Sequence, residues 1–112
     1  MKTTIKRTGD FTEDIGNYVE EKFSSLGKFV KHFEEAGEIE LSVELLSASK
    51  HHKHGDIFTA VAELRLPKKN LRAEEVGEDI RTAIDRARDT LRSEIEKYKT
   101  QFVELDKKKL GK

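Results

Sequence analysis

The feature that most constrains this fold is a change in the spacing of apolar residues along the chain. Between Ile39 and Leu45 every second residue is apolar, and the positions between them carry glutamate or serine. Such alternation is typical of a strand with one face buried and the other in water. Before this segment and after about residue 80, the apolar residues recur at helical spacing instead. The chain must therefore fold into both strands and helices.

Further strands are expected on both sides of this one. A second alternating run can turn its apolar residues inward, and a short third run follows the turn Pro67-Lys68-Lys69-Asn70, in which proline pre-sets φ. These runs predict hairpins. Near the N-terminus, a β-branched stretch around Ile5 predicts a short strand that ends at Gly9-Asp10. The inward residues expected in the second and third runs are Phe58, Ala60, Ala62, Leu64 and Leu66, then Leu71 and Ala73.

Two segments have the spacing of amphipathic helices. The first is expected to begin after a cap at Thr12, to extend for roughly 15–20 residues and to be loosened near Gly27. The second is expected to follow the acidic pair Glu78-Asp79. Their apolar stripes are Ile15, Val19, Leu26 and Phe33 in the first helix, and Ile80, Ala83, Ile84, Ala87, Leu91, Ile95 and Tyr98 in the second.

The order of elements predicts an α+β fold of the type β-α-β-β-β-α. Because each helix has one apolar stripe, both should pack on the same face of a four-stranded mixed sheet, giving two layers. The first helix can serve as a right-handed crossover between parallel strands. We expect one domain over residues 1–99 and a flexible basic tail over 100–112, where the apolar pattern is lost and lysines gather.

Composition excludes several classes of function. The chain has no cysteine, so disulfides, thiolate zinc sites and cysteine nucleophiles are absent. No apolar run exceeds three residues and no signal peptide is evident, which predicts a cytoplasmic protein without a membrane segment. The motifs GxxxxGK[ST], GxGxxG and GxSxG are missing. We therefore expect no enzymatic activity, no cofactor and no small-molecule substrate.

A histidine cluster offers the one candidate for metal binding. His51, His52 and His54 lie close together in a polar loop that also carries Lys50 and Lys53. Imidazoles can converge on zinc, nickel or copper, but the lysines repel cations and only one carboxylate is near. We predict a solvated hairpin loop with no metal, and contact with phosphate is the alternative.

Local charge matters more than total charge, because 22 Lys and Arg balance 22 Asp and Glu. Lys22 falls at the centre of the first helix's apolar stripe, where its stem either snorkels into water or positions an ammonium for a polar partner. On the second helix, four cations at spacings of seven, four and seven form a stripe that can follow phosphates. Carboxylates nearby leave a solvated salt-bridge face as the alternative. The cations are Arg81, Arg88, Arg92 and Lys99, and the carboxylates are Asp85, Asp89 and Glu96.

Three segments together resemble the ribosome hibernation promoting factors and ribosome-associated inhibitors, also called sigma-54 modulation proteins. Residues 15–26 (IGNYVEEKFSSL) are similar to the family's pattern of apolar-x-x-aromatic-Val-x-x-Lys-apolar-x-x-Leu, with Lys22 at its characteristic lysine. A second segment resembles the family's strand-turn-helix signature: Leu71-Arg72-Ala73-Glu74, followed by Glu78-Asp79-Ile80 and Ala83-Ile84-Asp85. The third segment, Lys97-Tyr98-Lys99, resembles the Lys-aromatic-Lys motif that closes the family's domain.

This resemblance implies a fold similar to double-stranded-RNA-binding domains and a function as a translation inhibitor. Members bind the small ribosomal subunit in the channel for messenger and transfer RNA and halt translation under stress. Long members add a C-terminal dimerisation domain, which this chain ends too soon to contain, so a short form that is monomeric off the ribosome is expected. The alternative is a regulatory protein-interaction module on the same fold with weak or no RNA binding.

The resemblance and helix geometry together nominate residues for binding ribosomal RNA. Where members tend to have basic residues, this chain has Thr90 and Ser93, whereas Arg88 and Arg92 stand where members often have uncharged residues. The cationic face of the second helix is therefore expected to be rotated. The nominated residues are Lys22, Lys28, Arg86, Lys97 and Lys99, with Arg81, Arg88 and Arg92 as additions.

Overall fold

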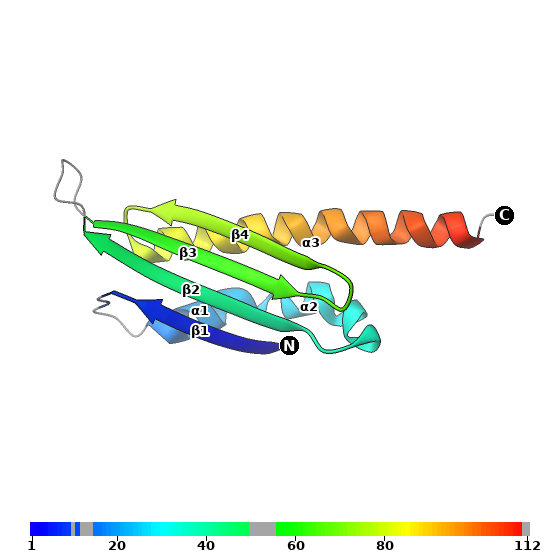
Figure 1. Cartoon of the computed structure of the whole chain (residues 1–112), viewed down its shortest axis with the longest axis horizontal. Helices are drawn as coiled ribbons and strands as arrows, with labels where there is room; N and C mark the ends of the chain where they lie inside the picture. The colour runs from blue at the N-terminus through cyan, green and yellow to red at the C-terminus, as the bar shows by residue number, and fades with distance from the viewer. Residues whose placement is uncertain (10, 12–14, 50–55, 111–112) are drawn as a thin grey trace.

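The computed structural model describes residues 1–9, 11, 15–49 and 56–110, and it confirms the expected α+β order. The strands form one layer, and the helices lie along one side of it (Figure 1). The elements are β1 (Lys2–Thr8), α1 (Ile15–Ser24), α2 (Gly27–Val30), the 3-10 helix η1 (Lys31–Ala36), β2 (Glu40–Ser49), β3 (Asp56–Arg65), β4 (Asn70–Gly77) and α3 (Ile80–Leu110).

The sheet is mixed, as expected, and its strands lie in the order β1-β2-β3-β4. β1 pairs in parallel with β2, with Ile5 opposite Val43, while the β2–β3 and β3–β4 pairs are antiparallel. The helical segment between β1 and β2 supplies the crossover that two parallel neighbours require. The hairpins predicted from the alternating runs are therefore confirmed.

The core lies between the sheet and the helices. On the inward face of β3 and β4, Ala62 pairs with Ala73, and both are buried. Ala83 and Ala87 are fully buried on α3, which packs over these two strands. Small side chains in both layers let the helix approach the sheet closely. Larger side chains complete the buried core, among them Val19, Phe23, Leu41, Leu45, Leu64, Ile84, Leu91 and Ile95.

The first helical segment breaks where the sequence predicts loosening. α1 ends at Ser24 and α2 begins at Gly27. The hydroxyls of Ser24 and Ser25 donate to the carbonyl oxygens of Glu21 and Lys22, at 2.9 and 3.2 Å, and thereby compete with helical hydrogen bonds. The apolar face nevertheless continues, since Leu26, Val30 and Phe33 are all buried. The predicted cap at Thr12 lies outside the described residues.

α3 begins at a sharp junction with β4. A Cβ on Gly77 would lie 2.8 Å from the backbone nitrogen of Ala83, so only glycine fits there without a shift. The Asp79 carboxylate then caps the helix, accepting from the Thr82 amide at 2.8 Å and from its hydroxyl at 3.0 Å. These two hydrogen bonds lower the pKa of Asp79.

α3 is longer than its apolar stripe. The stripe ends at Tyr98 and the sequence predicts fraying from Lys99, whereas the backbone is helical to Leu110 and extends past the sheet (Figure 1). A periodic stripe reports contact with the sheet, and where the sheet ends a helix can continue without one. The segment expected to be a basic tail is thus helical to Leu110, while the flexibility of 100–112 stays a prediction. No helix of the described residues is apolar enough over sufficient length to cross a membrane.

Candidate nucleic-acid interface

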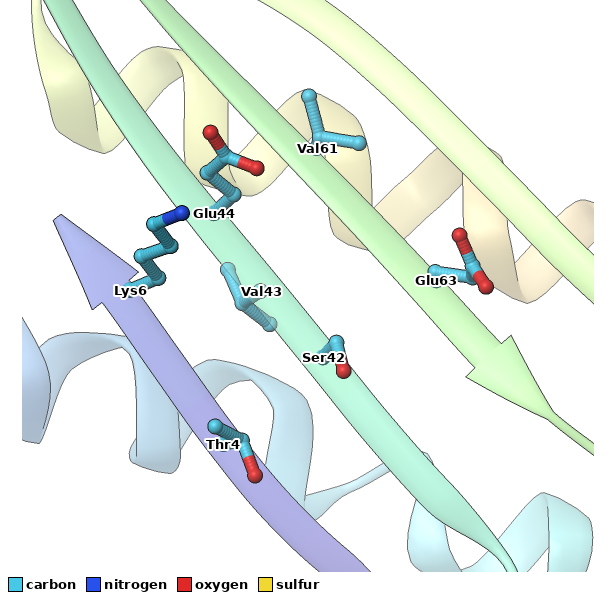
Figure 2. A pocket seen from close by; sticks show the side chains of 7 residues that line it. All are labelled: Thr4, Lys6, Ser42, Val43, Glu44, Val61 and Glu63. Carbon is cyan, nitrogen blue, oxygen red and sulfur yellow. The ribbon is translucent and has the colours of Figure 1, made fainter. Parts of the chain in front are cut away.

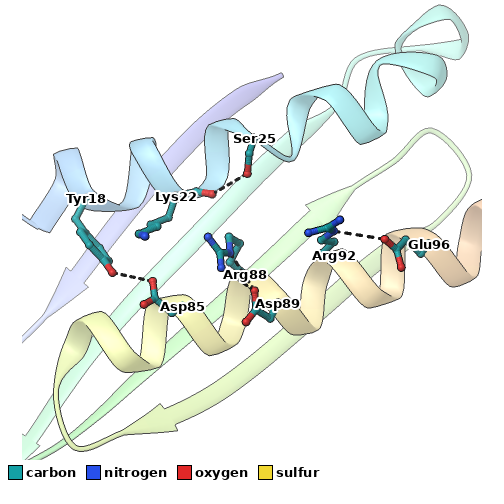
Figure 3. Close-up of polar contacts among 8 residues, drawn as sticks. All are labelled: Tyr18, Lys22, Ser25, Asp85, Arg88, Asp89, Arg92 and Glu96. Atoms are coloured by element: carbon teal, nitrogen blue, oxygen red, sulfur yellow. Dashed lines mark hydrogen bonds and ion pairs between the residues drawn. The ribbon is translucent and has the colours of Figure 1, made fainter.

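Five cations gather where α3 runs beside α1 and α2 on the outer side of the helical layer. We call this region the cationic seam and define it by Lys22, Arg81, Arg88, Arg92 and Lys99, with the rings of Tyr18 and Phe29 between them. Figure 3 shows Tyr18, Lys22, Arg88 and Arg92, the part of the seam where α1 faces α3. The first and last of the four α3 cations are 18 positions apart, which at the rise of an α-helix is about 27 Å. Helical spacing therefore produces an extended stripe of positive charge.

Tyr18 organises one end of the seam. Its hydroxyl donates to Asp85 Oδ1 across a distance of 2.7 Å and so joins α1 to α3. The ring lies 5.3 Å from Lys22 Nζ and 5.2 Å from Arg81 Cζ, within the range of cation–π attraction. Burial, together with the hydrogen bond to Asp85, raises the pKa of Tyr18 to about 12. The phenol therefore stays protonated and continues to donate at neutral pH.

Phe29 has the equivalent place at the other end of the seam. The guanidinium carbon of Arg92 lies 4.8 Å from the ring centroid, and Lys99 Nζ lies 5.3 Å from it. Such contacts bring a cation to a defined place without neutralising it. The two aromatic side chains thus hold four of the five cations along the line between the helices.

Carboxylates beside the seam pair with two of its arginines. Arg88 donates to Asp89 Oδ1 from Nε at 3.1 Å and from Nη2 at 2.8 Å. Arg92 Nε lies 3.4 Å from Glu96 Oε1. Both sequence interpretations of this stripe are therefore represented, because it contains surface salt bridges and a continuous row of cations on the same flank of α3.

The Lys22 side chain leaves the apolar stripe, as the snorkelling interpretation expects, and its role toward a partner stays a prediction. The residue is partly exposed, so its stem leaves the apolar stripe instead of entering the core. Its side chain extends toward α3, and the ammonium ends over the Tyr18 ring (Figure 3). The lysine is thus both snorkelling and held at a defined place.

The remaining nominated residues lie elsewhere. Arg86 is on the opposite flank of α3, where Nη1 donates to the backbone oxygen of Val76 at 2.7 Å. Lys97 follows Arg86 by eleven residues and so shares that flank, and its Nζ lies 3.7 Å from Glu94 Oε1. Lys28 is exposed on α2. The structure therefore brings five of the eight nominated residues together.

Sequence reasoning missed the contribution of the aromatic side chains. Tyr18 and Phe29 stand at the edges of the first helix's apolar stripe, and nothing local shows that they meet residues on α3. The spacing of Tyr18 and Lys22, four residues apart on one helix, was the available signal. The contact between Tyr18 and Asp85 spans 67 residues of sequence and depends on the packing of the two helices.

The other side of the sheet carries a shallow hollow of mixed charge (Figure 2). Lys6 and Glu44 are cross-strand partners there, and Glu63 lines the same hollow. Adjacent charges of opposite sign do not favour an anionic ligand. Among the residues that the structure describes, no group of three His, Cys, Asp or Glu side chains is placed to hold a metal. The cluster His51, His52 and His54 lies outside them.

Comparison with known proteins adds independent evidence. Residues 3–102 match the family model described as sigma 54 modulation protein / S30EA ribosomal protein. A ribosome hibernation promotion factor from Deinococcus radiodurans is 30% identical over 97 residues, covering 87% of this chain and 48% of the relative. A protein of the same name from Lactococcus lactis is 34% identical over 95 residues, covering 83% and 46%. The chain thus spans about half the length of these relatives.

Solved structures agree with the fold. The N-terminal domain of Protein Y from Thermus thermophilus superimposes with a TM-score of 0.66 at 30% identity, covering 88% of this chain and 99% of that domain. A ribosomal subunit interface protein from Coxiella burnetii gives a TM-score of 0.60 at 16% identity, covering 89% and 99%, which is a likeness of fold.

Proposed function

The chain belongs to the sigma 54 modulation protein / S30EA ribosomal protein family, and from that premise we propose that it is a cytoplasmic, non-enzymatic ribosome hibernation factor. The observation that carries this proposal is the cationic seam. Two relatives named ribosome hibernation promotion factor match most of the chain, which supports the same function. The partner would be the small ribosomal subunit, bound in its channel for messenger and transfer RNA.

The chemistry of the seam favours the phosphate backbone of RNA. Arginine and lysine side chains along about 27 Å of α3 can contact several phosphates, which gives affinity without reading base sequence. The rings of Tyr18 and Phe29 each have two cations close by, so they serve to position charge more than to stack on bases. Ribosomal RNA presents its phosphates in a fixed arrangement, and a fixed row of cations suits it.

Within this proposal the seam residues have different tasks from the other nominated residues. Lys22, Arg81, Arg88, Arg92 and Lys99 contact phosphates. Arg86 is already engaged by a backbone oxygen of β4, and Lys97 by Glu94. Lys28 is exposed on α2, outside the seam.

Sedimentation with purified small ribosomal subunits tests the function. The protein should sediment with the subunits at low salt and should be released progressively as salt is raised, because each phosphate contact releases condensed counterions. Messenger RNA and initiator transfer RNA should compete with it if the site is the channel. Failure to sediment with subunits at low salt would contradict the proposal and favour the regulatory protein-interaction module.

A further inference from the structure

Two of the seam's arginines already bind carboxylates of their own helix. Asp89 accepts two hydrogen bonds from Arg88 through a single oxygen, and Glu96 lies beside Arg92. A phosphate that approaches either guanidinium meets a group with the same charge and the same acceptor chemistry. Binding must therefore displace these carboxylates or share the arginine with them.

The exposure of the partners shows which of them can move. The Arg88 side chain is only 29% exposed, whereas the Asp89 side chain is 67% exposed. The guanidinium is thus held among its neighbours, while the carboxylate can swing into water. Arg92 and Glu96 are both more than half exposed, but Arg92 is also held over the Phe29 ring. In both pairs the arginine is the fixed partner and the carboxylate is the displaceable one.

Asp85, the third carboxylate of this flank, has a different role. It accepts the Tyr18 hydroxyl at 2.7 Å in a partly buried contact between two helices. Displacing it would break the link between α1 and α3. Asp85 is therefore part of the framework that places the cations.

We propose that Asp89 and Glu96 determine how tightly the seam binds RNA, because they compete with phosphate for Arg88 and Arg92. This inference rests on the proposed function and adds the residues that limit its affinity. The two carboxylates lower the positive charge of the free seam and occupy donors that a phosphate would use. Removing their charge should strengthen binding without adding any new contact.

The variants Asp89→Asn and Glu96→Gln test this competition. Each should tighten binding by about two- to fivefold, the range expected from one exposed ion pair, and the double variant by more. Affinity is measured both for small subunits and for a fluorescein-labelled oligouridylate, which presents a phosphate backbone without ribosomal structure. Thermal melts confirm that the variants fold like the natural protein.

Two matched controls remove the same charge from pairs outside the seam. Glu74→Gln breaks the 3.3 Å pair with Arg72 on the open face of the sheet, and Glu94→Gln breaks the pair with Lys97 on the other flank of α3. At physiological salt the Debye length is about 8 Å, so these distant charges are largely screened. Both controls should change affinity by less than about twofold.

A second comparison tests whether the competition is for the arginine itself. In an Arg88→Gln background, Asp89→Asn should no longer tighten binding, since the donor that both anions seek is gone. Persistence of the full gain in that background would overturn the inference, as would equal gains in Asp89→Asn and Glu94→Gln.

The two probes separate this inference from the proposed function. Tighter binding of the oligouridylate by the Asp89 and Glu96 variants supports the competition, even if no form binds subunits, which would contradict the ribosomal function alone. Subunit binding that is the same in all forms would contradict the competition alone. If no form binds either probe, both are wrong.

Discussion

The two flanks of α3 carry similar cations in different circumstances. On the flank that faces α1 and α2, arginines and Lys99 meet aromatic rings and exposed carboxylates, and they form part of the cationic seam. On the opposite flank, which we call the β4 flank, Arg86 donates to the backbone oxygen of Val76 at the end of β4. Thr90 donates to Glu75 of the same strand at 3.0 Å.

The comparison indicates that the group an arginine or lysine contacts determines whether its side chain holds the fold together or stays available to a ligand. A guanidinium bound to a fixed backbone oxygen holds one element to another, and moving it would leave that oxygen without its donor. A guanidinium over an aromatic ring keeps its charge and most of its donors for a ligand. The seam flank is therefore suited to binding and the β4 flank to holding the helix on the sheet.

The largest expected effect comes from removing two charges on one flank and comparing the other. Arg88→Gln with Arg92→Gln should lower affinity for small subunits by on the order of tenfold to a hundredfold and reduce the salt slope by about two. Arg86→Gln with Lys97→Gln removes the same charge from the β4 flank and should leave the affinity and slope nearly unchanged. Equal losses in the two double variants would show that the flanks do not differ. Binding curves at two salt concentrations give both quantities.

The next effect concerns the attachment of the seam flank to α1. The unfolded Tyr18 phenol ionises near the ordinary tyrosine pKa of 10.0, whereas the folded phenol retains its proton until about 12. Between these values the unfolded state loses a proton that the folded state keeps, so the free energy of unfolding should fall as pH rises from 10 to 12. The shift sets an upper limit of roughly 3 kcal/mol, which solvent screening reduces.

Tyr18→Phe isolates this effect from other groups that titrate in the same range. In Tyr18→Phe the free energy of unfolding should fall less between pH 10 and 12 than in the natural protein. In Tyr98→Phe it should fall as much as in the natural protein. Denaturant unfolding at intervals from pH 9 to 12 measures the free energies. A decline of the same size in Tyr18→Phe would mean that the hydroxyl does not link the helices in solution.

Lys22→Ala should produce a smaller loss, confined to binding. Affinity for small subunits should fall several-fold and the salt slope by about one, because a single phosphate contact is lost. Stability should change by no more than about 1 kcal/mol, since the ammonium already lies outside the core. Lys6→Ala removes the same charge from the open face of the sheet and should leave affinity intact. Unchanged affinity in Lys22→Ala would remove this lysine from the site.

Arg86→Gln is expected to have the smallest effect. Loss of the hydrogen bond to Val76 should lower the free energy of unfolding by about 1 kcal/mol or less, because the contact is exposed to water. Affinity for subunits should not change. Arg86→Lys keeps the charge but not the geometry, so it should be destabilised to a similar degree. A drop in affinity at unchanged stability would place the β4 flank in the binding surface.

Most of the fold could be predicted from the sequence because each element carries its own pattern. Alternation at 39–45 predicted β2, and the stripe from Ala83 to Ile95 predicted the buried face of α3. Element ends were less predictable. The end of α3 could not be read from burial, since its last part extends past the sheet, and the pieces after Ser24 depend on local competition by serine hydroxyls.

The site was only partly predictable, because its residues come from two helices. Spacing along α3 was enough to place Arg81, Arg88, Arg92 and Lys99 on one flank. It did not show that Arg86 would be held by β4. What spacing could not give was the identity of the neighbour across the packing interface. Across that interface Tyr18 meets Asp85, and Arg86 meets the backbone oxygen of Val76.

The parallel pairing of β1 with β2 has a consequence for how the chain folds and opens. Ser49 pairs with Asp56 within one hairpin, whereas Lys2 pairs with Glu40 only after the whole helical segment between them has been closed into a loop. Closing that long loop costs conformational entropy before the hydrogen bonds between β1 and β2 can form. In addition, β1 is an edge strand and pairs with β2 alone. We therefore expect the hairpins to form early and β1 to join the sheet last. In the native protein, β1 should also detach first, so its amide hydrogens should exchange with solvent faster than those of β3.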